Sequence, residues 1–235
     1  MAEHVEFRIL GDDMQMVEIE LDPGQEVRAE AGAMLFMEEG IEMETGVGGI
    51  LGGLKRLVTG ENFFITSFIN EARIMRRVGF AAPYPGKIIA LDLKELGGQF
   101  FCQKESFLCA ASGVNIGVAF SQKIGAGLFG GEGFILQKLS GTGLAFIHAG
   151  GGVIAKTLAP GEAIRIDTGC LVALASTVKY DIRFIGGFRN ALFGGEGVFL
   201  AKLTGPGKVF LQTLPFARLA DRILAAAGRL KGSEK

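Results

Sequence analysis

The sequence predicts an all-β protein of three tandem pseudo-repeats, each a short double-stranded β-helix or sandwich unit, followed by one amphipathic helix. Three observations predict this class: a long motif that occurs twice, runs of alternating apolar and polar residues, and 37 glycines among 235 residues. The glycine share, about 16%, is roughly twice its usual value, while the share of charged residues is ordinary. Repeated tight turns therefore explain the glycines better than disorder or a collagen helix does.

The repetition is clearest in two segments that lie 64 residues apart. Residues 128–146 and 192–210 both begin Leu-Phe-Gly-Gly-Glu-Gly and agree at twelve of their nineteen positions. A fainter copy begins at Gly60, where Gly-Glu-Asn-Phe-Phe-Ile corresponds to Gly-Glu-Gly-Phe-Ile-Leu from Gly131. Self-similarity of this kind indicates that one structural module occurs several times.

Apolar and polar residues alternate inside every predicted unit. The alternation is plain at residues 17–21, 41–43, 114–118 and 178–184. Successive side chains of a strand point to opposite faces, so one face can enter a core while the other meets water. This pattern is typical of an antiparallel sheet.

The predicted units divide the chain into one compact body and a tail. We expect β repeats at residues 1–79, 80–152 and 153–214, and a C-terminal helix and tail at 215–235. Pro-Gly turns precede the alternating runs, and we take the pairs that start at Pro23, Pro85 and Pro160 as equivalent. On that alignment the second unit holds about eleven extra residues around 94–104, which predicts a longer hairpin.

Residues 215–231 are the segment with helical periodicity, because apolar residues recur there every three or four positions. The other face is polar, and Arg218, Arg222 and Arg229 are candidate contacts with a membrane or a partner. Two interpretations remain open. The helix covers a sheet edge or an oligomer contact, or it rests as a basic amphipathic helix on anionic lipid.

Residues that usually perform catalysis are scarce. The chain has only two histidines, His4 and His148, and its three cysteines form no Cys-x-x-Cys pair. We expect His148, in an apolar glycine-rich run, to be a partly buried strand or loop residue. Residues 125–130 match Gly-x-Gly-x-x-Gly, but a strand-like segment follows where a dinucleotide site needs a helix. The sequence thus predicts no enzyme, no catalytic residues, no cofactor and no metal.

One acidic residue recurs in the repeats. Glu61, Glu132 and Glu196 each follow a glycine and are expected at three equivalent positions of the fold. A carboxylate that accepts backbone N–H bonds in a tight turn recurs because the turn recurs, so a structural role is the favoured interpretation. The alternative is a set of acids that lines an axis and binds a cation.

Several motifs together carry a family resemblance. They are the segments 26–34, 41–44 and 49–56, the Gly-Glu pair that ends at Glu61, and the two Leu-Phe-Gly-Gly-Glu-Gly motifs. From about Phe7 to Leu214 the chain resembles the bacterial relatives of the altered-inheritance-of-mitochondria protein 24 family.

The resemblance implies a fold and an assembly but no activity. Such proteins look like three fused copies of the shortened double-stranded β-helix of the tryptophan RNA-binding attenuation protein, which implies association into rings, with trimers favoured. Eukaryotic members are linked to mitochondrial inner-membrane organisation and respiratory-complex upkeep. No catalytic residues come with the resemblance, and the RNA and tryptophan binding of the attenuation protein does not transfer, because its Lys/Arg contact triplet has no match here.

The expected function is therefore that of a nonenzymatic, homo-oligomeric β scaffold that binds an unidentified protein or a membrane-associated partner. One alternative is a peripheral membrane protein that uses the basic C-terminal helix. Another is a small-ligand or metal-binding module, or an enzyme, with a pocket between repeats. A net charge of −1 argues against nucleic acid as a partner. The start of the chain reads as a strand and not as a secretory signal, so a cytoplasmic location is expected.

Overall fold

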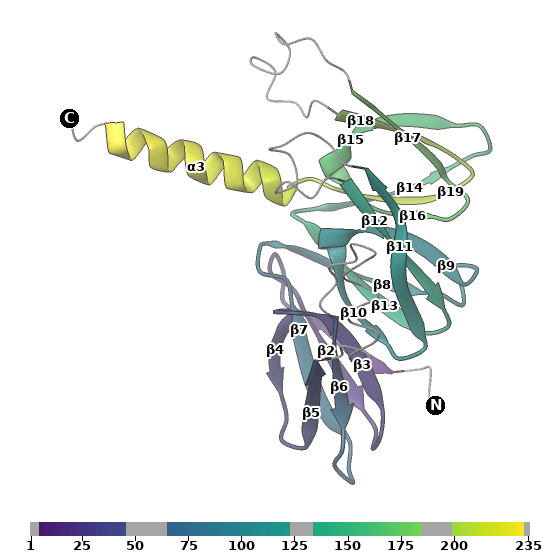
Figure 1. Cartoon of the computed structure of the whole chain (residues 1–235), viewed down its shortest axis with the longest axis vertical. Helices are drawn as coiled ribbons and strands as arrows, with labels where there is room; N and C mark the ends of the chain where they lie inside the picture. Colours follow the sequence, from purple (N-terminus) through teal and green to yellow (C-terminus); the bar gives the residue numbers. More distant parts are fainter. Residues whose placement is uncertain (1–4, 46–64, 123–133, 185–198, 233–235) are drawn as a thin grey trace.

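The computed structural model describes residues 5–45, 65–122, 134–184 and 199–232. These residues form nineteen β-strands, two short 3-10 helices and one long helix, arranged as a stack of sheets from which the helix projects (Figure 1). The predicted all-β class with a single C-terminal helix is confirmed.

The strands fall into three successive groups of six. A leading strand, β1 (Glu6–Leu10), precedes them. The first group is β2 (Met16–Leu21), β3 (Glu26–Glu30), β4 (Met34–Met37), β5 (Ile41–Thr45), β6 (Ile65–Asn70) and β7 (Arg76–Ala81). The second is β8 (Gly86–Asp92), β9 (Gln99–Gln103), β10 (Phe107–Ala111), β11 (Val114–Gln122), β12 (Phe134–Gly141) and β13 (Leu144–Gly150). The third is β14 (Val153–Leu158), β15 (Ala163–Asp167), β16 (Leu171–Ala175), β17 (Lys179–Phe184), β18 (Phe199–Thr204) and β19 (Gly207–Gln212).

The same pairing occurs inside each group. The sixth strand pairs with the first and third, and the fifth pairs with the second and fourth, always antiparallel. Each group therefore contributes two three-stranded half-sheets, and their apolar faces enclose a core.

Two further pairings join the groups. The second strand of one group pairs with the third strand of the next, as β3 with β10 and β9 with β16. These pairings give two six-stranded sheets that each span two groups, with a four-stranded sheet β1-β2-β7-β4 at one end and a three-stranded sheet β15-β18-β17 at the other. Backbone hydrogen bonding thus runs from group to group along the stack.

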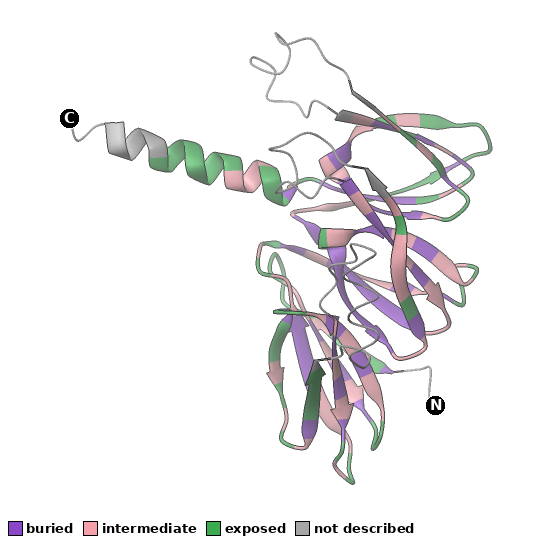
Figure 2. Ribbon diagram, in the orientation of Figure 1, coloured by how far each residue is buried: buried purple, intermediate pink, exposed green. Residues whose placement is uncertain are grey.

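Burial follows the alternation in the sequence. On β2 the side chains of Val17, Ile19 and Leu21 are fully buried, while the intervening glutamates are only partly covered. Central strands differ, because β10 and β13 are buried along their whole length and carry nearly continuous apolar residues (Figure 2). Elements packed on both faces of a strand explain this continuous pattern.

The Pro-Gly pairs are not all equivalent. Gly24 and Gly161 both have positive φ, 78° and 80°, in the turns between the first and second strands of their groups. Gly86 instead begins β8, where an added Cβ would strike the backbone of β13. The corresponding loops cover residues 22–25, 93–98 and 159–162, so the expected insertion of about eleven residues is wrong. A Pro-Gly pair marks a turn but not which turn of the topology it is.

The helix α3 (Phe216–Gly232) leaves the stack at its first turn. Residues 221–227 are all exposed, so this stretch does not cover a sheet edge of its own chain (Figure 2). Within the described part of the chain, no helix combines the length and the apolarity needed to traverse a bilayer.

The core can be tested with one substitution at two sites. Ile147 on β13 is fully buried, whereas Ile74 is 60% exposed in a turn. We expect Ile147→Ala to lower the free energy of unfolding by about 2–5 kcal/mol, because it removes buried methyl groups and leaves a cavity. Ile74→Ala is the control and should cost at most about 0.5 kcal/mol. Urea unfolding followed by circular dichroism at one protein concentration measures both, and equal losses would contradict the assignment of the core.

Candidate functional site

Two of the edge strands, β4 at one end of the stack and β15 at the other, correspond to strands that pair across the junctions elsewhere in the chain. Among the described strands β4 pairs only with β7, and β15 pairs only with β18. The counterpart of β4 in the other groups is β10 or β16, and each pairs with a second strand of the preceding group. The counterpart of β15 is β3 or β9, and each pairs with a third strand of the following group. Among the described strands, one edge of each type that the chain pairs internally therefore has no strand partner.

The composition of β4 does not suit an exposed edge. Its sequence Met-Leu-Phe-Met is continuously apolar, like Phe-Leu-Cys-Ala-Ala on β10 and Leu-Val-Ala-Leu-Ala on β16. Strands β10 and β16 are almost entirely buried, whereas Leu35 is 58% exposed and Met34 and Met37 are 37% and 39% exposed. Long apolar edges promote association with other chains, and folded proteins usually cover them.

The internal pairings define which residues of the open edges correspond. Cys109 lies opposite Ala29 and Ala110 opposite Arg28, and the next junction repeats this with Ala173 and Leu174. By the registers with β7, β13 and β19, Phe36 and Met37 occupy the positions of Cys109 and Ala110. On β15 the equivalent partners are Ile166 and Arg165.

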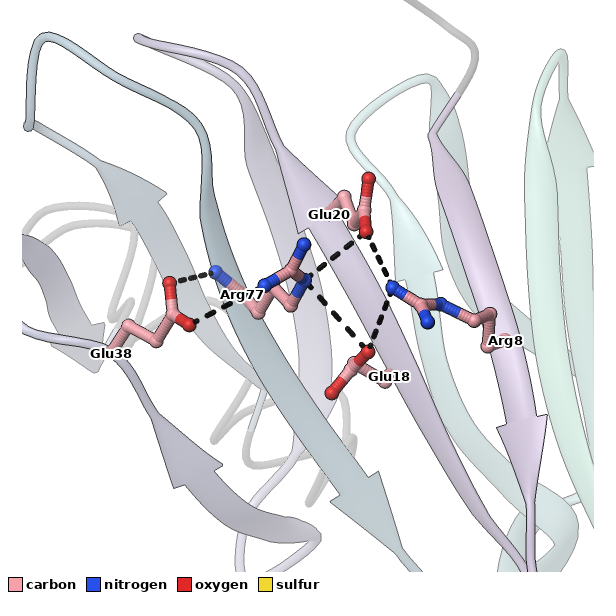
Figure 3. A network of polar contacts seen from close by, with 5 residues as sticks. All are labelled: Arg8, Glu18, Glu20, Glu38 and Arg77. Carbon is pink, nitrogen blue, oxygen red and sulfur yellow. Dashed lines mark hydrogen bonds and ion pairs between the residues drawn. The ribbon is translucent and has the colours of Figure 1, made fainter.

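Charged side chains cover the outer face of the sheet that ends in β4. The Arg8 guanidinium donates to Glu20 at 3.0 Å, and Arg77 donates to the same carboxylate at 3.1 Å (Figure 3). Glu18 joins the network through Arg8, and Glu38, just after β4, accepts from the Arg77 backbone N–H. Hydrogen bonds from Arg8 and then Arg77 lower the pKa of Glu20. This polar network joins β1, β2, β7 and the residue after β4, so the outer face of this sheet is charged while its β4 edge is apolar.

A second feature is a pocket of about 410 Å³ between the first and second groups. It is bounded by the end of β3, the linker between β7 and β8, the 3-10 helix Lys104–Ser106, β13 and the start of α3. Its polar or aromatic lining residues are Glu30, Tyr84, Glu105, Phe107, His148 and Phe216. The other walls are small or apolar, mainly alanines.

His148 lies on β13, as a strand residue, and is 2% exposed. Its imidazole forms a hydrogen bond with the backbone of Tyr84, and the Tyr84 ring packs edge-on against the imidazole at 4.6 Å between centroids. Burial lowers the pKa of His148 to about 4, so the ring is neutral at physiological pH. Its Nδ1 atom is buried without a hydrogen-bond partner among the described residues.

The carboxylate of Glu30 lies in an unfavourable environment for charge. Burial is the main cause that raises the pKa of Glu30 to about 7; the charge of Lys104 opposes this shift and the charge of Glu105 adds to it. Burial raises the pKa of Tyr84 to about 12, with Glu105 and Glu30 contributing. The pocket thus combines the carboxyl groups of Glu30 and Glu105 with a neutral histidine.

At the junction between the second and third groups, the counterpart of His148 makes different hydrogen bonds. Ile147 of β13 pairs with Phe107, and Leu211 of β19 pairs in the same way with Leu171. The next residue along each strand, His148 or Gln212, therefore occupies the same position. The Gln212 Oε1 accepts from the Gly150 N–H at 2.8 Å, and its Nε2 donates to the Gly169 carbonyl at 2.7 Å. A side-chain amide therefore bridges the second junction where the first has an imidazole beside a pocket.

The position of Glu30 also has a counterpart with a cationic partner. By the strand registers Glu30 corresponds to Gln103 in the second group and Asp167 in the third. Asp167 Oδ2 accepts from the Arg218 guanidinium at 2.7 Å, while its Oδ1 accepts from the Gly169 N–H. No salt bridge joins Glu30 to any cation in the described ranges.

Arg218 and Arg222, two of the candidate residues of the sequence analysis, are not among the residues that line the pocket. Glu61, Glu132 and Glu196 fall outside the described residues. Arg218 pairs with Asp167 and Arg222 is exposed, while the side chain of Arg229 is not described. Burial raises the pKa of the Cys102 and Cys109 thiols. Over the described ranges, no three His, Cys, Asp or Glu side chains cluster as a metal site would require.

The fold and these sites define a class: an all-β protein of three similarly paired strand groups in which, among the described strands, β4 and β15 each keep one edge without a strand partner. The sequence also matches the model of the family described as Mitochondrial biogenesis AIM24 over residues 7–214. The chain belongs to this family.

Known relatives agree with that assignment. An uncharacterised protein of Streptococcus pyogenes serotype M6 is 29% identical over 217 residues, which cover 88% of this chain and 85% of the relative. The crystal structure of another Streptococcus pyogenes protein superposes with a TM-score of 0.79 at 25% identity, covering 94% of this chain and 99% of that one. The relatives share the fold, and their names state no activity.

The pocket groups predict opposite effects of pH on stability. The pKa of Glu30 is raised in the folded protein, so its favourable contribution is complete below pH 4.5 and is lost as pH rises through 7. The free energy of unfolding of Glu30→Gln should therefore rise relative to that of the wild type as pH increases from about 4.5 to 7. The total gain should be on the order of 1–3 kcal/mol. Urea titrations across this range measure the difference, with the exposed Glu42→Gln as a control.

His148 acts in the opposite sense. Its pKa is lowered in the folded protein, so the stability it contributes is present above pH 6.5 and is lost as pH falls through about 4. His148→Gln, which copies the residue at the next junction, should stabilise the fold relative to wild type only as pH falls through this window. A difference independent of pH for both variants would show that the two groups titrate normally.

Proposed function

We propose that this protein is a nonenzymatic scaffold that assembles head to tail, with β4 of one copy paired to β15 of the next. One observation carries the proposal. The chain joins its own groups twice by pairing a second strand with a third strand, and one edge of each type has no partner among the described strands. A head-to-tail contact generates a ring when its rotation closes. Three copies would place nine groups in the ring, and the family resemblance favours this number.

The apolar character of β4 supports the proposal independently. Pairing would cover Leu35 and its neighbours, as the equivalent strands β10 and β16 are covered within the chain. It would also complete the backbone hydrogen bonds of both open edges. In such a ring every copy would carry its α3 helix at an equivalent position, which suits a scaffold that presents helices to a protein or membrane-associated partner.

A cysteine pair tests both the contact and its direction. Met37 and Arg165 are expected to lie opposite each other across the interface, so the double variant Met37→Cys/Arg165→Cys should form disulfides between copies under mild oxidation. Non-reducing electrophoresis should show a ladder that ends at the size of the ring. Each single variant is the matched control and should give no such ladder.

Two outcomes would contradict this assembly. Dimers formed by Met37→Cys alone would indicate that two copies of β4 meet about a two-fold axis. A stable species of 24.9 kDa in light scattering, at every dilution of the wild-type protein, would show that the edges remain open in solution.

The exposed stripe on α3 supports a second candidate function, peripheral binding to a membrane surface. Phe216, Ile223 and Leu224 are 47%, 59% and 68% exposed, and Arg222 lies exposed beside them. An amphipathic helix with basic residues can lie at the boundary of headgroups and acyl chains, where its apolar face is buried.

Vesicle flotation tests this candidate. The double variant Ile223→Glu/Leu224→Glu should lose cofractionation with vesicles that contain anionic phosphatidylserine, because it places charge on the apolar face. Ile74→Glu, which adds a carboxylate at an exposed apolar position outside α3, is the control and should leave flotation unchanged. Flotation that survives the double substitution would exclude α3 as the membrane contact.

A further inference from the structure

We propose that the pocket between the first two groups binds a small organic cation, a primary ammonium carried on an apolar group, with Glu30 as its counter-ion. The pocket volume, about 410 Å³, is in the range of sites that enclose small molecules. The proposal goes beyond the scaffold function and does not depend on it, because every lining residue belongs to one chain.

The charge of the pocket favours a cation. Glu30 is half-buried on β3, and Glu105 is exposed at the 3-10 helix that faces it. Each carboxylate disfavours the ionisation of nearby acidic groups, and only Lys104 among the neighbouring charges favours ionisation of Glu30. The neutral imidazole of His148 adds no positive charge. A bound ammonium would supply a salt-bridge partner for Glu30.

The molecule already uses this position of the fold for a cation. Asp167, the counterpart of Glu30 in the third group, holds the Arg218 guanidinium at 2.7 Å. At the third group the cation comes from α3 of the same chain, and at the second group the equivalent Gln103 is uncharged. Glu30 keeps the carboxylate without a salt bridge to the described part of its own chain, so an external cation fits the same geometry.

The walls specify an apolar and preferably aromatic body for the ligand. Tyr84 lies 5.3 Å from Phe216 and 4.6 Å from His148 between ring centroids, and Phe107 lines the pocket as well. Aromatic faces attract ammonium groups and bury apolar carbon. Because His148 does not bridge the junction as Gln212 does, the space between the groups remains open to a ligand.

Binding has a signature that a purely structural pocket lacks. Burial keeps Glu30 largely protonated below pH 7, and an ammonium beside it favours the ionised form. Entry of the cation near pH 6.5 should therefore release up to about one proton from the protein. The other ionisable groups at the pocket are Glu105, Lys104, Tyr84 and His148.

Three probes of similar size and different charge test whether the pocket selects a cation. They are 2-phenylethylammonium, neutral 2-phenylethanol and anionic phenylacetate. In calorimetric titrations of the full chain at pH 6.5, we expect the ammonium to bind at least about tenfold more tightly than the alcohol, and phenylacetate not to bind. Repeating the titration in phosphate and in imidazole buffer counts the protons released.

Two variants test the assignment of residues. Glu30→Gln should weaken the ammonium by about tenfold or more, abolish proton release and leave the alcohol unchanged. Glu42→Gln makes the same substitution at an exposed position of β5 and is the matched control. Ala31→Phe, at an exposed position of the pocket lining, should obstruct both the ammonium and the alcohol without requiring any change in the core.

The proposal fails if the ammonium and the alcohol bind equally, or if the ammonium shows no binding at concentrations of about 10 mM. It also fails if Glu30→Gln and Glu42→Gln weaken the ammonium by the same factor, since that would reflect only the net charge of the surface. Light scattering on the same samples reports the assembly separately, so a negative result for the ligand leaves the ring proposal standing.

Discussion

Backbone hydrogen bonding between the second strand of one group and the third strand of the next is the constraint on which this structure depends. A group alone has two half-sheets with free edges, and each junction removes one edge from both partners. The sheets therefore continue through the junctions, and buried residues of neighbouring groups share a core, as Ala110, Val172 and Phe210 do. The pairing that holds the stack together also determines which edges are left at its ends.

The fold class is predictable because its signals are local. Alternation along residues 16–21 and glycines in turns require no knowledge of distant contacts. The topology is harder, and the alignment of Pro85-Gly86 with the other pairs is wrong because a turn dipeptide carries no information about which strands it joins. Residues 34–37 carry a signal of another kind, which a search for alternation misses. Their four apolar side chains match the buried strands β10 and β16, so composition alone indicates a strand that needs a cover.

The pocket could not be predicted, because it depends on residues that are distant in sequence. Glu30 and His148 belong to different groups, and only the pairing of β3, β10 and β13 brings their strands into one sheet. The shifted pKa values of Glu30 and His148 arise mainly from burial. The sequence does not show that either residue is buried, because one is a polar residue at a strand end and the other a histidine within a strand. The recurring glutamates are conspicuous in the sequence because they repeat, whereas the pocket lies where the groups differ.

That contrast has a physical basis. In a repeated module, a residue present in every copy stabilises the fold that all copies share. A residue that differs between copies makes contacts that exist in one copy only. One position of the module is occupied by Glu30, Gln103 and Asp167 in the three groups. Glu30 lines a pocket, Gln103 is a buried amide, and Asp167 pairs with Arg218. Phe216 lines the pocket and is also the first residue of α3, while Arg218, two residues further along the helix, is held by Asp167. Both acidic copies of the position therefore lie at the base of the projecting helix: Glu30 lines a pocket with Phe216, and Asp167 holds Arg218.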